Sequence, residues 1–446
     1  MKKFVKHLMG LSLVAAMLVP SVTALAQAEA SFVTVTGVVK DENTRKEVPF
    51  ASISIPGTHI GTVANADGEF TLKVLKSLNA TDFEVTHIGY LNKRFNIEEA
   101  LKNGKTYYIA PHSVPLKEVV VRPEDPESII RGALTNVKKN YSENPNILVG
   151  FYRESIKQKR DYVSISEAVI DVYKGAYQKE FDNDRVRIYR GRKSGDVKKA
   201  DTLVVKLQGG PHIAMLLDIV KNPYVLLDPE MLRYYSYEVL DLVNIDNEMN
   251  YVIGFTPRVE QDFPSYTDKV KVSTAWRAIP PKAELDFPLY MGKIYITTES
   301  LAISMVEFSM DLSDPDKAAL QFVRRKPAGL RFTPTAATYL VTYKKQNDKY
   351  FLNYIRTEVA FKCKWNRKIF SSNYTIMSEM AITDRQLDGV TRFTSKESLK
   401  STAVLADMVP VFFADDFWGE YNVIEPEESI QSAIKKINRK LKRDGN

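Results

Sequence analysis

The stretch ASISIPGTHIGTVANADGEFTLKV, residues 51–74, decides the fold class of the N-terminal part of the chain. Apolar and polar residues alternate with a period of two in residues 51–55 and again in residues 69–74. Successive side chains of a strand point to opposite faces, so each run has one apolar and one polar face. Turn signals separate the runs at Pro56-Gly57 and at residues 65–68. Short strands at this spacing predict an antiparallel β-sandwich.

Five short segments carry a family resemblance: TGVVKD at 36–41, PFASI at 49–53, GT at 61–62, NADGEF at 65–70 and IGY at 88–90. Together they resemble the carboxypeptidase regulatory-like domain. The resemblance implies a transthyretin-like or immunoglobulin-like β-sandwich, which we place at residues 27–112. In that family the module is a non-catalytic companion of the peptidase. We therefore expect structural roles for the residues of the pattern, which are Gly37, Asp41, Gly61, Asp67, Gly68, Phe70, Gly89 and Tyr90.

Residues 113–143 are predicted to be a linker that runs into a helix. The segment LKEVVV at 116–121 resembles the one that often follows this module in outer-membrane receptors of the TonB-dependent class. No plug and barrel pattern follows it here, so a receptor function is not expected. After two prolines, apolar residues recur at helical spacing, at Ile129, Ile130, Ala133, Leu134 and Val137.

The first 26 residues are predicted to be a secretory signal peptide. A basic start at residues 2–6 precedes an apolar run at 8–19, and Ala24-Leu25-Ala26 is a cleavage site of the A-x-A type. The apolar run is shorter than the roughly 20 residues that span a bilayer. A lipid-bearing cysteine would have to follow the cleavage site, where Gln27 stands. We expect an exported protein, periplasmic or associated with the outer membrane, without a lipid anchor.

Composition narrows the function classes further. The chain has 446 residues, of which 44% are hydrophobic and 26% charged, so large-scale disorder is not expected. Its single cysteine, Cys363, excludes an intramolecular disulfide. The net charge is +7, but the basic residues are scattered among acidic ones, whereas nucleic-acid binding requires a clustered basic face. We expect no nucleic-acid partner.

Residues 144–405 are predicted to form a large, curved antiparallel sheet with few helices, so that the whole chain is mainly β. Three pairs of extended segments flank polar turns, at 235–241 with 251–255, at 293–297 with 301–310, and at 338–343 with 350–361. Parts of this region resemble the uncharacterised region that follows the sandwich in many exported proteins, and more weakly the half-barrel of lipoprotein carriers. A helix is expected at residues 213–220. A membrane β-barrel is the less favoured alternative.

Residues 406–446 combine an aromatic-rich segment with a predicted amphipathic helix. Ile430, Ile434, Ile437 and Leu441 form one apolar stripe, and lysine and arginine gather toward the end of the helix. The favoured interpretation is a helix docked on the large domain. The alternative is peripheral contact with an anionic membrane surface.

No familiar reactive centre is visible in the sequence. None of the histidines His59, His87, His112 and His212 has the spacing of a zinc site, and no G-x-S-x-G motif occurs. Asp67 and Gly68 fit a hairpin turn with Gly68 at positive φ better than a calcium loop. Cys363 falls on an apolar face and is expected to be a core thiol. We predict no catalytic residue, no metal ligand and no cofactor.

The resulting hypothesis is a non-catalytic exported protein of the cell envelope that acts in binding or assembly with an envelope partner. One alternative is a carrier of an apolar ligand, a lipid or acyl chain, held in a half-barrel. Another is a hydrolase of envelope glycans or peptides, which would need two carboxylates across a cleft, and acid pairs such as Asp182/Asp184 and Asp415/Asp416 lie in polar, turn-like stretches.

Overall fold

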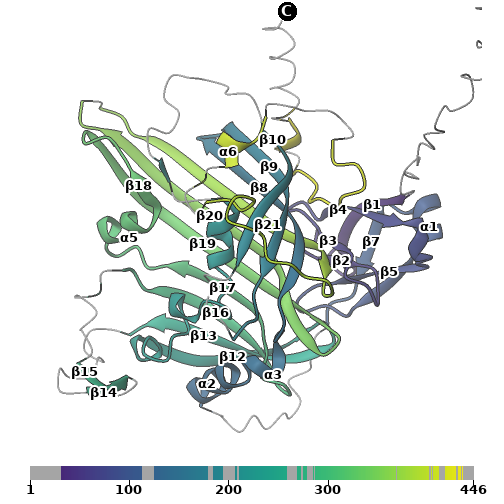
Figure 1. Ribbon diagram of the computed structural model, residues 1–446, viewed down its shortest axis with the longest axis horizontal. Coiled ribbons are helices and arrows are strands. Elements are labelled where there is room, and N and C mark those ends of the chain that lie inside the picture. The colour runs from purple at the N-terminus through teal and green to yellow at the C-terminus, as the bar shows by residue number, and fades with distance from the viewer. Residues whose placement is uncertain are drawn as a thin grey trace, which may run out of the picture.

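The computed structural model is mainly β, with a small two-sheet module beside one large sheet (Figure 1). The predicted signal peptide, the segment at 116–121 and the basic end of the C-terminal helix lie outside the residues that the structure describes, and those predictions stay predictions. The described residues are 32–112, 125–178, 184–193, 206–207, 210–258, 269–272, 275–278, 285, 287–367, 369–400, 403, 405–410, 417–427, 430–432 and 434.

The N-terminal module is a sandwich of two small sheets, which confirms the predicted fold class. One sheet has the strand order β4-β1-β7 and the other β3-β2-β5-β6. The inward residues Phe70, Leu72 and Phe83 are fully buried between the sheets, because each strand turns its apolar face inward. The elements are β1 (Phe32–Asp41), β2 (Ser52–Ser54), β3 (Gly61–Val63), β4 (Glu69–Leu75), η1 (Lys76–Leu78), β5 (Asp82–Thr86), β6 (Lys93–Asn96), α1 (Ile97–Asn103) and β7 (Thr106–Ile109).

The large domain is built on one open, curved antiparallel sheet in the order β10-β9-β8-β21-β20-β19-β17-β16-β13-β12. Its edge strands β10 and β12 do not pair with each other, so the sheet is not closed. The strands are β8 (Asn146–Gln158), β9 (Asp161–Lys174), β10 (Arg185–Lys193), β12 (Tyr235–Ile245), β13 (Glu248–Pro257), β16 (Tyr290–Thr297), β17 (Ile303–Met310), β19 (Leu330–Gln346), β20 (Lys349–Trp365) and β21 (Ser372–Gln386).

The three predicted hairpins are confirmed as β12–β13, β16–β17 and β19–β20. Two short strand pairs lie apart from the main sheet: β11 (Lys206–Leu207) with β18 (Val323–Arg325), and β14 (Lys269–Val272) with β15 (Ala275–Ala278). Among the described residues, no helix combines the length and the apolar character that a membrane crossing requires.

One face of the large sheet, called the helix face below, packs against most of the helices among the described residues. Side chains such as Ile294, Val306 and Val341 are completely buried there. The helical elements are α2 (Pro126–Thr135), α3 (Val137–Asn140), α4 (Pro211–Leu216), η3 (Pro223–Val225), η4 (Leu232–Tyr234), α5 (Pro315–Phe322) and α6 (Leu405–Met408).

Two helix predictions need correction. The helix expected within residues 113–143 is divided at Asn136, so that α2 and α3 are separate helices. The helix expected at 213–220 begins at Pro211 and ends at Leu216. Asn222 folds back there, and its side-chain amide donates to the carbonyls of Met215 and Leu216, which satisfies the end of the helix.

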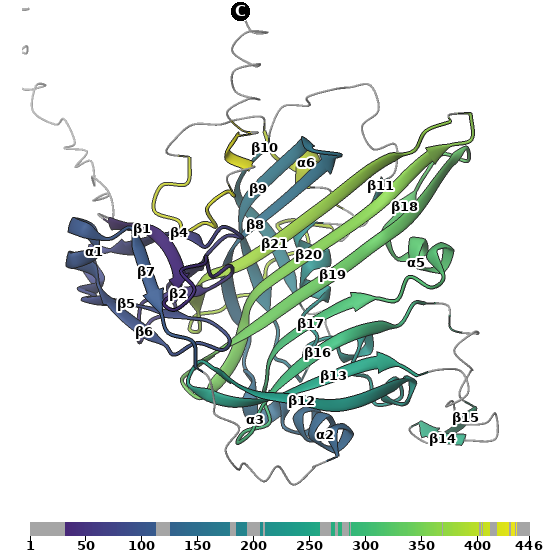
Figure 2. The ribbon, with the colours of Figure 1, turned by 180° about the vertical axis from the view of Figure 1, so that it is seen from behind.

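The opposite face, called the cleft face below, carries the sandwich and, near the C-terminus, residues 417–427, 430–432 and 434. Figure 2 shows the sandwich beside one end of the long strands β19, β20 and β21. Val63 of the sandwich, Tyr354 of β20 and Ile424 share one buried apolar cluster. Ile430 and Ile434 pack against Met377 of β21, which confirms that this part of the C-terminal helix docks on the domain.

Candidate functional site

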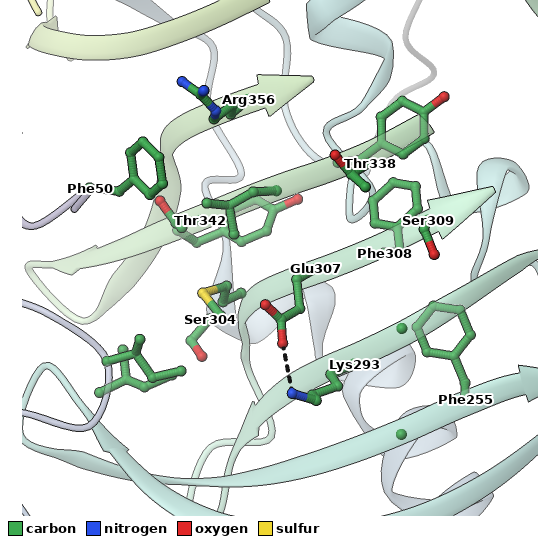
Figure 3. Close-up of a pocket in the computed structure, with 18 of the residues that line it drawn as sticks. Phe50, Phe255, Lys293, Ser304, Glu307, Phe308, Ser309, Thr338, Thr342 and Arg356 are labelled. Atoms are coloured by element: carbon green, nitrogen blue, oxygen red, sulfur yellow. Dashed lines mark ion pairs between the residues drawn. The ribbon is translucent and has the colours of Figure 1, made fainter. Parts of the chain in front are cut away.

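A cleft of about 1090 Å³ lies between the sandwich and the cleft face of the sheet (Figure 3). The sandwich contributes residues of two loops, including Phe50, His87 and Ile88. The floor comes from strands β12, β13, β16, β17, β19 and β20. Because two separate parts of the chain form its walls, the cleft exists only when the sandwich is docked.

Strand register arranges the floor in rows that run across the sheet. The row nearest the sandwich contains Met305 of β17, which faces Thr342 of β19. The outermost row contains Ser309 of β17, which faces Thr338. Met305 is buried and Thr338 is exposed, so the cleft is closed at the sandwich end and open at the other.

The middle row of the floor carries charge. Lys293 and Glu307 form an ion pair at 3.1 Å, visible in Figure 3, and Tyr295 donates a hydrogen bond to the same carboxylate at 2.8 Å. Burial, followed by the nearby Glu307 carboxylate, raises the pKa of Tyr295. The charges of Lys293 and Glu307 therefore balance each other. The middle row of the floor consists of this neutral pair and the aliphatic side chain of Leu340.

Arg356 marks the wall where the sandwich meets the floor. Its guanidinium lies 5.0 Å from the ring centroid of Phe50 and forms ion pairs with Glu379 at 3.5 Å and Glu358 at 3.7 Å. Burial lowers the pKa of Arg356, but Tyr354 and the nearby carboxylates raise it by more. The net pKa of Arg356 is therefore raised. The residue is therefore a fixed cation that clamps Phe50 in place.

At the closed end of the cleft, residues near the ends of strands β19 and β12 contact the sandwich. Lys344 donates to the hydroxyl of Ser54 at 2.6 Å. The Gly89 amide donates to the carbonyl of Asn244 at 2.9 Å. Burial lowers the pKa of His87, which lines this end. These contacts join regions far apart in sequence, so the docking is specific.

A buried ion cluster ties the C-terminal segment to the cleft face beside the sandwich. Arg153 contacts Glu167 at 2.8 Å and Glu379 at 2.9 Å, and all three are almost completely buried. The same guanidinium donates to the carbonyl of Ile424 at 2.8 Å. Asn422 in turn exchanges hydrogen bonds with the backbone of Lys73 in the sandwich. The sheet, the C-terminal segment and the sandwich thus form one connected unit.

A second ion cluster lies on the helix face, away from the cleft. The ammonium of Lys174 contacts Asp184 at 2.9 Å and Asp218 at 2.7 Å. Tyr343 and Tyr177 donate to Asp218 at 2.8 and 3.1 Å. Burial lowers the pKa of Lys174, but the carboxylates of Asp184 and Asp218 raise it by more, so its net pKa is raised. Sequence reasoning missed both clusters, although charged residues within long apolar strands such as β8 and β9 are a usable signal.

The eight residues of the family pattern all lie in the sandwich, and none of them lines the cleft. Gly68 and Gly89 both have φ of +73°, and a Cβ on Gly37 would meet the Tyr107 ring at 2.3 Å. The carboxylate of Asp41 accepts a hydrogen bond from the hydroxyl of Tyr90 at 2.8 Å. Phe70 belongs to the module core, Gly61 to β3, and Asp67 to the turn before β4.

Two candidate reactive groups, Cys363 and Asp184, lie outside the cleft. Burial raises the pKa of Cys363 to about 11, the opposite of what a nucleophilic thiol requires. Asp184, from one of the noted acid pairs, is the partner of Lys174, whereas Asp182, Asp415 and Asp416 lie outside the described residues. Among the described residues, no group of three or more histidine, cysteine, aspartate or glutamate side chains is arranged to bind a metal ion.

Comparison with known proteins supports the assignment of the N-terminal module. Residues 35–121 match the family model of the CarboxypepD_reg-like domain. The match confirms the resemblance that residues 36–90 carry. No curated protein matches the chain.

Several solved structures are similar to the larger part of the chain, all at low TM-score. A putative outer membrane lipoprotein-sorting protein domain from Vibrio parahaemolyticus is 10% identical, with 60% of this chain and 95% of that chain covered and a TM-score of 0.23. A LolA superfamily protein from Nitrosomonas europaea is 9% identical, with coverage of 61% and 98% and a TM-score of 0.20. Lipovitellin is 8% identical, with coverage of 58% and 27% and a TM-score of 0.24. At these scores they carry no argument about the ligand.

Proposed function

We propose that this chain is a non-catalytic exported protein of the cell envelope that binds an apolar, chain-bearing ligand in the cleft between sandwich and sheet. The observation that carries the proposal is the cleft itself, which two separate parts of the chain build together. Ligand sites of proteins are mostly apolar hollows of roughly 300–1,000 Å³, and they occur preferentially between domains. At about 1090 Å³ the cleft lies just above the upper end of this range, and it has this position between domains.

The lining suits a flexible apolar ligand. Aromatic, aliphatic and methionine side chains from both walls face the space, and methionine adapts its shape to different contacts. A single ligand chain that lies along the floor would cover the rows described above. It would displace water from the apolar surface of the cleft. The apolar residues of the lining include Phe50, Ile88, Leu240, Ile245, Met291, Met305 and Leu340.

Two features support a binding role over a hydrolytic one. The carboxylate of Glu307 forms an ion pair with Lys293 and accepts a hydrogen bond from Tyr295, so both contacts commit it to partners within the protein. Glu379, near the cleft wall, is held by Arg153 and Arg356. Carboxylates committed to cations in this way stabilise the structure and are poorly placed to transfer protons to a substrate.

The proposal is tested by filling the cleft. Thr342 lies half-buried on the floor, and Thr342→Trp would occupy the space that the ligand needs. We expect wild-type protein to bind a fluorescent long-chain fatty acid probe, and the variant to bind it at least about tenfold more weakly, a change of about 1.4 kcal/mol. Fluorescence titration measures both affinities, and native mass spectrometry of gently purified protein shows any ligand carried from the cell.

The matched control is Lys362→Trp, which adds the same side chain to an exposed position of β20 outside the cleft. This variant should bind the probe like wild type. Equal binding by Thr342→Trp and wild type, or no binding of any chain-bearing probe by wild type, would contradict the proposed function.

A further inference from the structure

Three lysine and arginine side chains line the cleft among the described residues, and one of them differs from the others. Lys293 is paired with Glu307, and Arg356 is paired with several carboxylates. Lys344 forms no ion pair with any described carboxylate, and its one described side-chain partner is the neutral hydroxyl of Ser54. The closed end of the cleft therefore holds an ammonium group whose charge is not directly balanced.

The surroundings of Lys344 make an anionic ligand favourable there. Burial lowers the pKa of Lys344, while Asp246 and Glu84 oppose that effect from beyond ion-pair distance and Arg385 adds to it. Burying a charge without a partner is costly, and an opposite charge at hydrogen-bond distance removes much of the cost. One ammonium balances one negative charge, which favours a carboxylate.

The position of Lys344 also fixes a direction. Alternate residues of β19 lie along the floor from the closed end to the mouth: Lys344, Thr342, Leu340 and Thr338. Six residues of a strand span about 20 Å, which is close to the length of an extended long-chain acyl group. A ligand with its acid group at Lys344 would extend its chain over Leu340 toward the open mouth.

We propose that the ligand is a single-chain amphiphile with a terminal carboxylate, a fatty acid, bound with its acid group at Lys344 and its chain toward the mouth of the cleft. This inference rests on the proposed function and specifies the ligand of the same site. Lys344 is thereby a selectivity residue, and its hydrogen bond to Ser54 places the ammonium at the junction of sandwich and sheet.

The test compares two probes of equal chain length, palmitic acid and hexadecanol, by competition with the fluorescent probe on the full chain. We expect wild type to bind the acid about tenfold or more tightly than the alcohol, because charge-assisted hydrogen bonds contribute roughly 1.5–3 kcal/mol. Lys344→Met should reduce the preference to less than about twofold while its affinity for the alcohol stays close to that of wild type. Lys344→Gln serves as a second variant if the first does not fold.

Two controls separate selectivity from a purely structural role. Ser54→Ala removes the hydroxyl that holds Lys344 but keeps the charge, so the acid preference should remain. Lys362→Gln removes an exposed cation of β20 outside the cleft, so the preference should remain there too. Loss of the preference in both of these variants would overturn the inference.

The two proposals fail in different ways. If wild type binds acid and alcohol equally, or if Lys344→Met keeps the preference, the role of Lys344 is wrong while the cleft remains a site for apolar chains. If wild type binds neither probe, the proposed function itself is wrong, and the inference falls with it.

Discussion

The two faces of the large sheet are made by the same strands and yet have different surfaces. On β16, Ile294 is completely buried on the helix face, while the neighbouring Lys293 lies on the floor of the cleft. On β17, Val306 and Glu307 divide in the same way. Alternation of side chains along a strand allows this separation. The comparison teaches that one face is a permanent core, whereas the other is a surface only partly covered by a second module.

The largest expected effect concerns the ion cluster of the helix face. Lys174→Met would leave Asp184 and Asp218 buried without their cation, and we expect a loss of about 3–5 kcal/mol in the free energy of unfolding. Urea denaturation followed by circular dichroism measures it. Arg94→Met, which breaks an exposed pair with Glu84 on the sandwich, should cost less than about 1 kcal/mol. Equal losses in the two variants would show that the helix-face cluster is not the buried core described here.

The next prediction compares the two faces within a single strand. Ile294→Ala on the helix face should cost about 2–5 kcal/mol, because it removes a completely buried side chain and leaves a cavity. Met291→Ala on the cleft face, where the side chain is 37% exposed, should cost less than about 1 kcal/mol. The same denaturation experiment serves for both. A larger loss for Met291→Ala than for Ile294→Ala would reverse the assignment of core and surface.

The sequence carries enough information to predict each module but not how they meet. Period-two alternation and turn residues predict the sandwich and three hairpins of the sheet, since these signals are local. The length of the helix at Pro211 was predicted wrongly, because Asn222 ends it from outside the helix. Hydrophobic periodicity contains no signal for such a capping contact.

The cleft could not be predicted for a related reason. Its closed end depends on Lys344 and Ser54, which are separated by 290 positions in the chain. Its wall depends on Phe50, which the family pattern contains only as part of PFASI, and on Arg356, which belongs to no motif. The family pattern led to residues that shape the sandwich, whereas the cleft is lined by their neighbours. A binding surface assembled by docking leaves no compact signature in the sequence.

The smallest expected effect concerns the sandwich that covers the cleft face, through Asp41. The backbone amide of Thr44 and then the hydroxyl of Tyr90 hold the pKa of Asp41 below its ordinary value. A carboxylate with a lowered pKa stabilises the folded state above its unfolded value of about 3.9, and this contribution is lost as the pH falls through the lowered value. Asp41→Asn should therefore destabilise the sandwich at pH 7, and its difference from wild type should shrink below about pH 4.

Hydrogen exchange read separately on the two modules checks this prediction and returns to the comparison of the faces. Faster exchange should be confined to the sandwich and the cleft wall at Phe50, while Ile294 and the rest of the helix face stay protected. Tyr90→Phe, which removes only the hydroxyl that Asp41 accepts, should show a weaker form of the same change. If exchange increased equally on the helix face, the core would depend on the docked sandwich, and the two faces would not be independent.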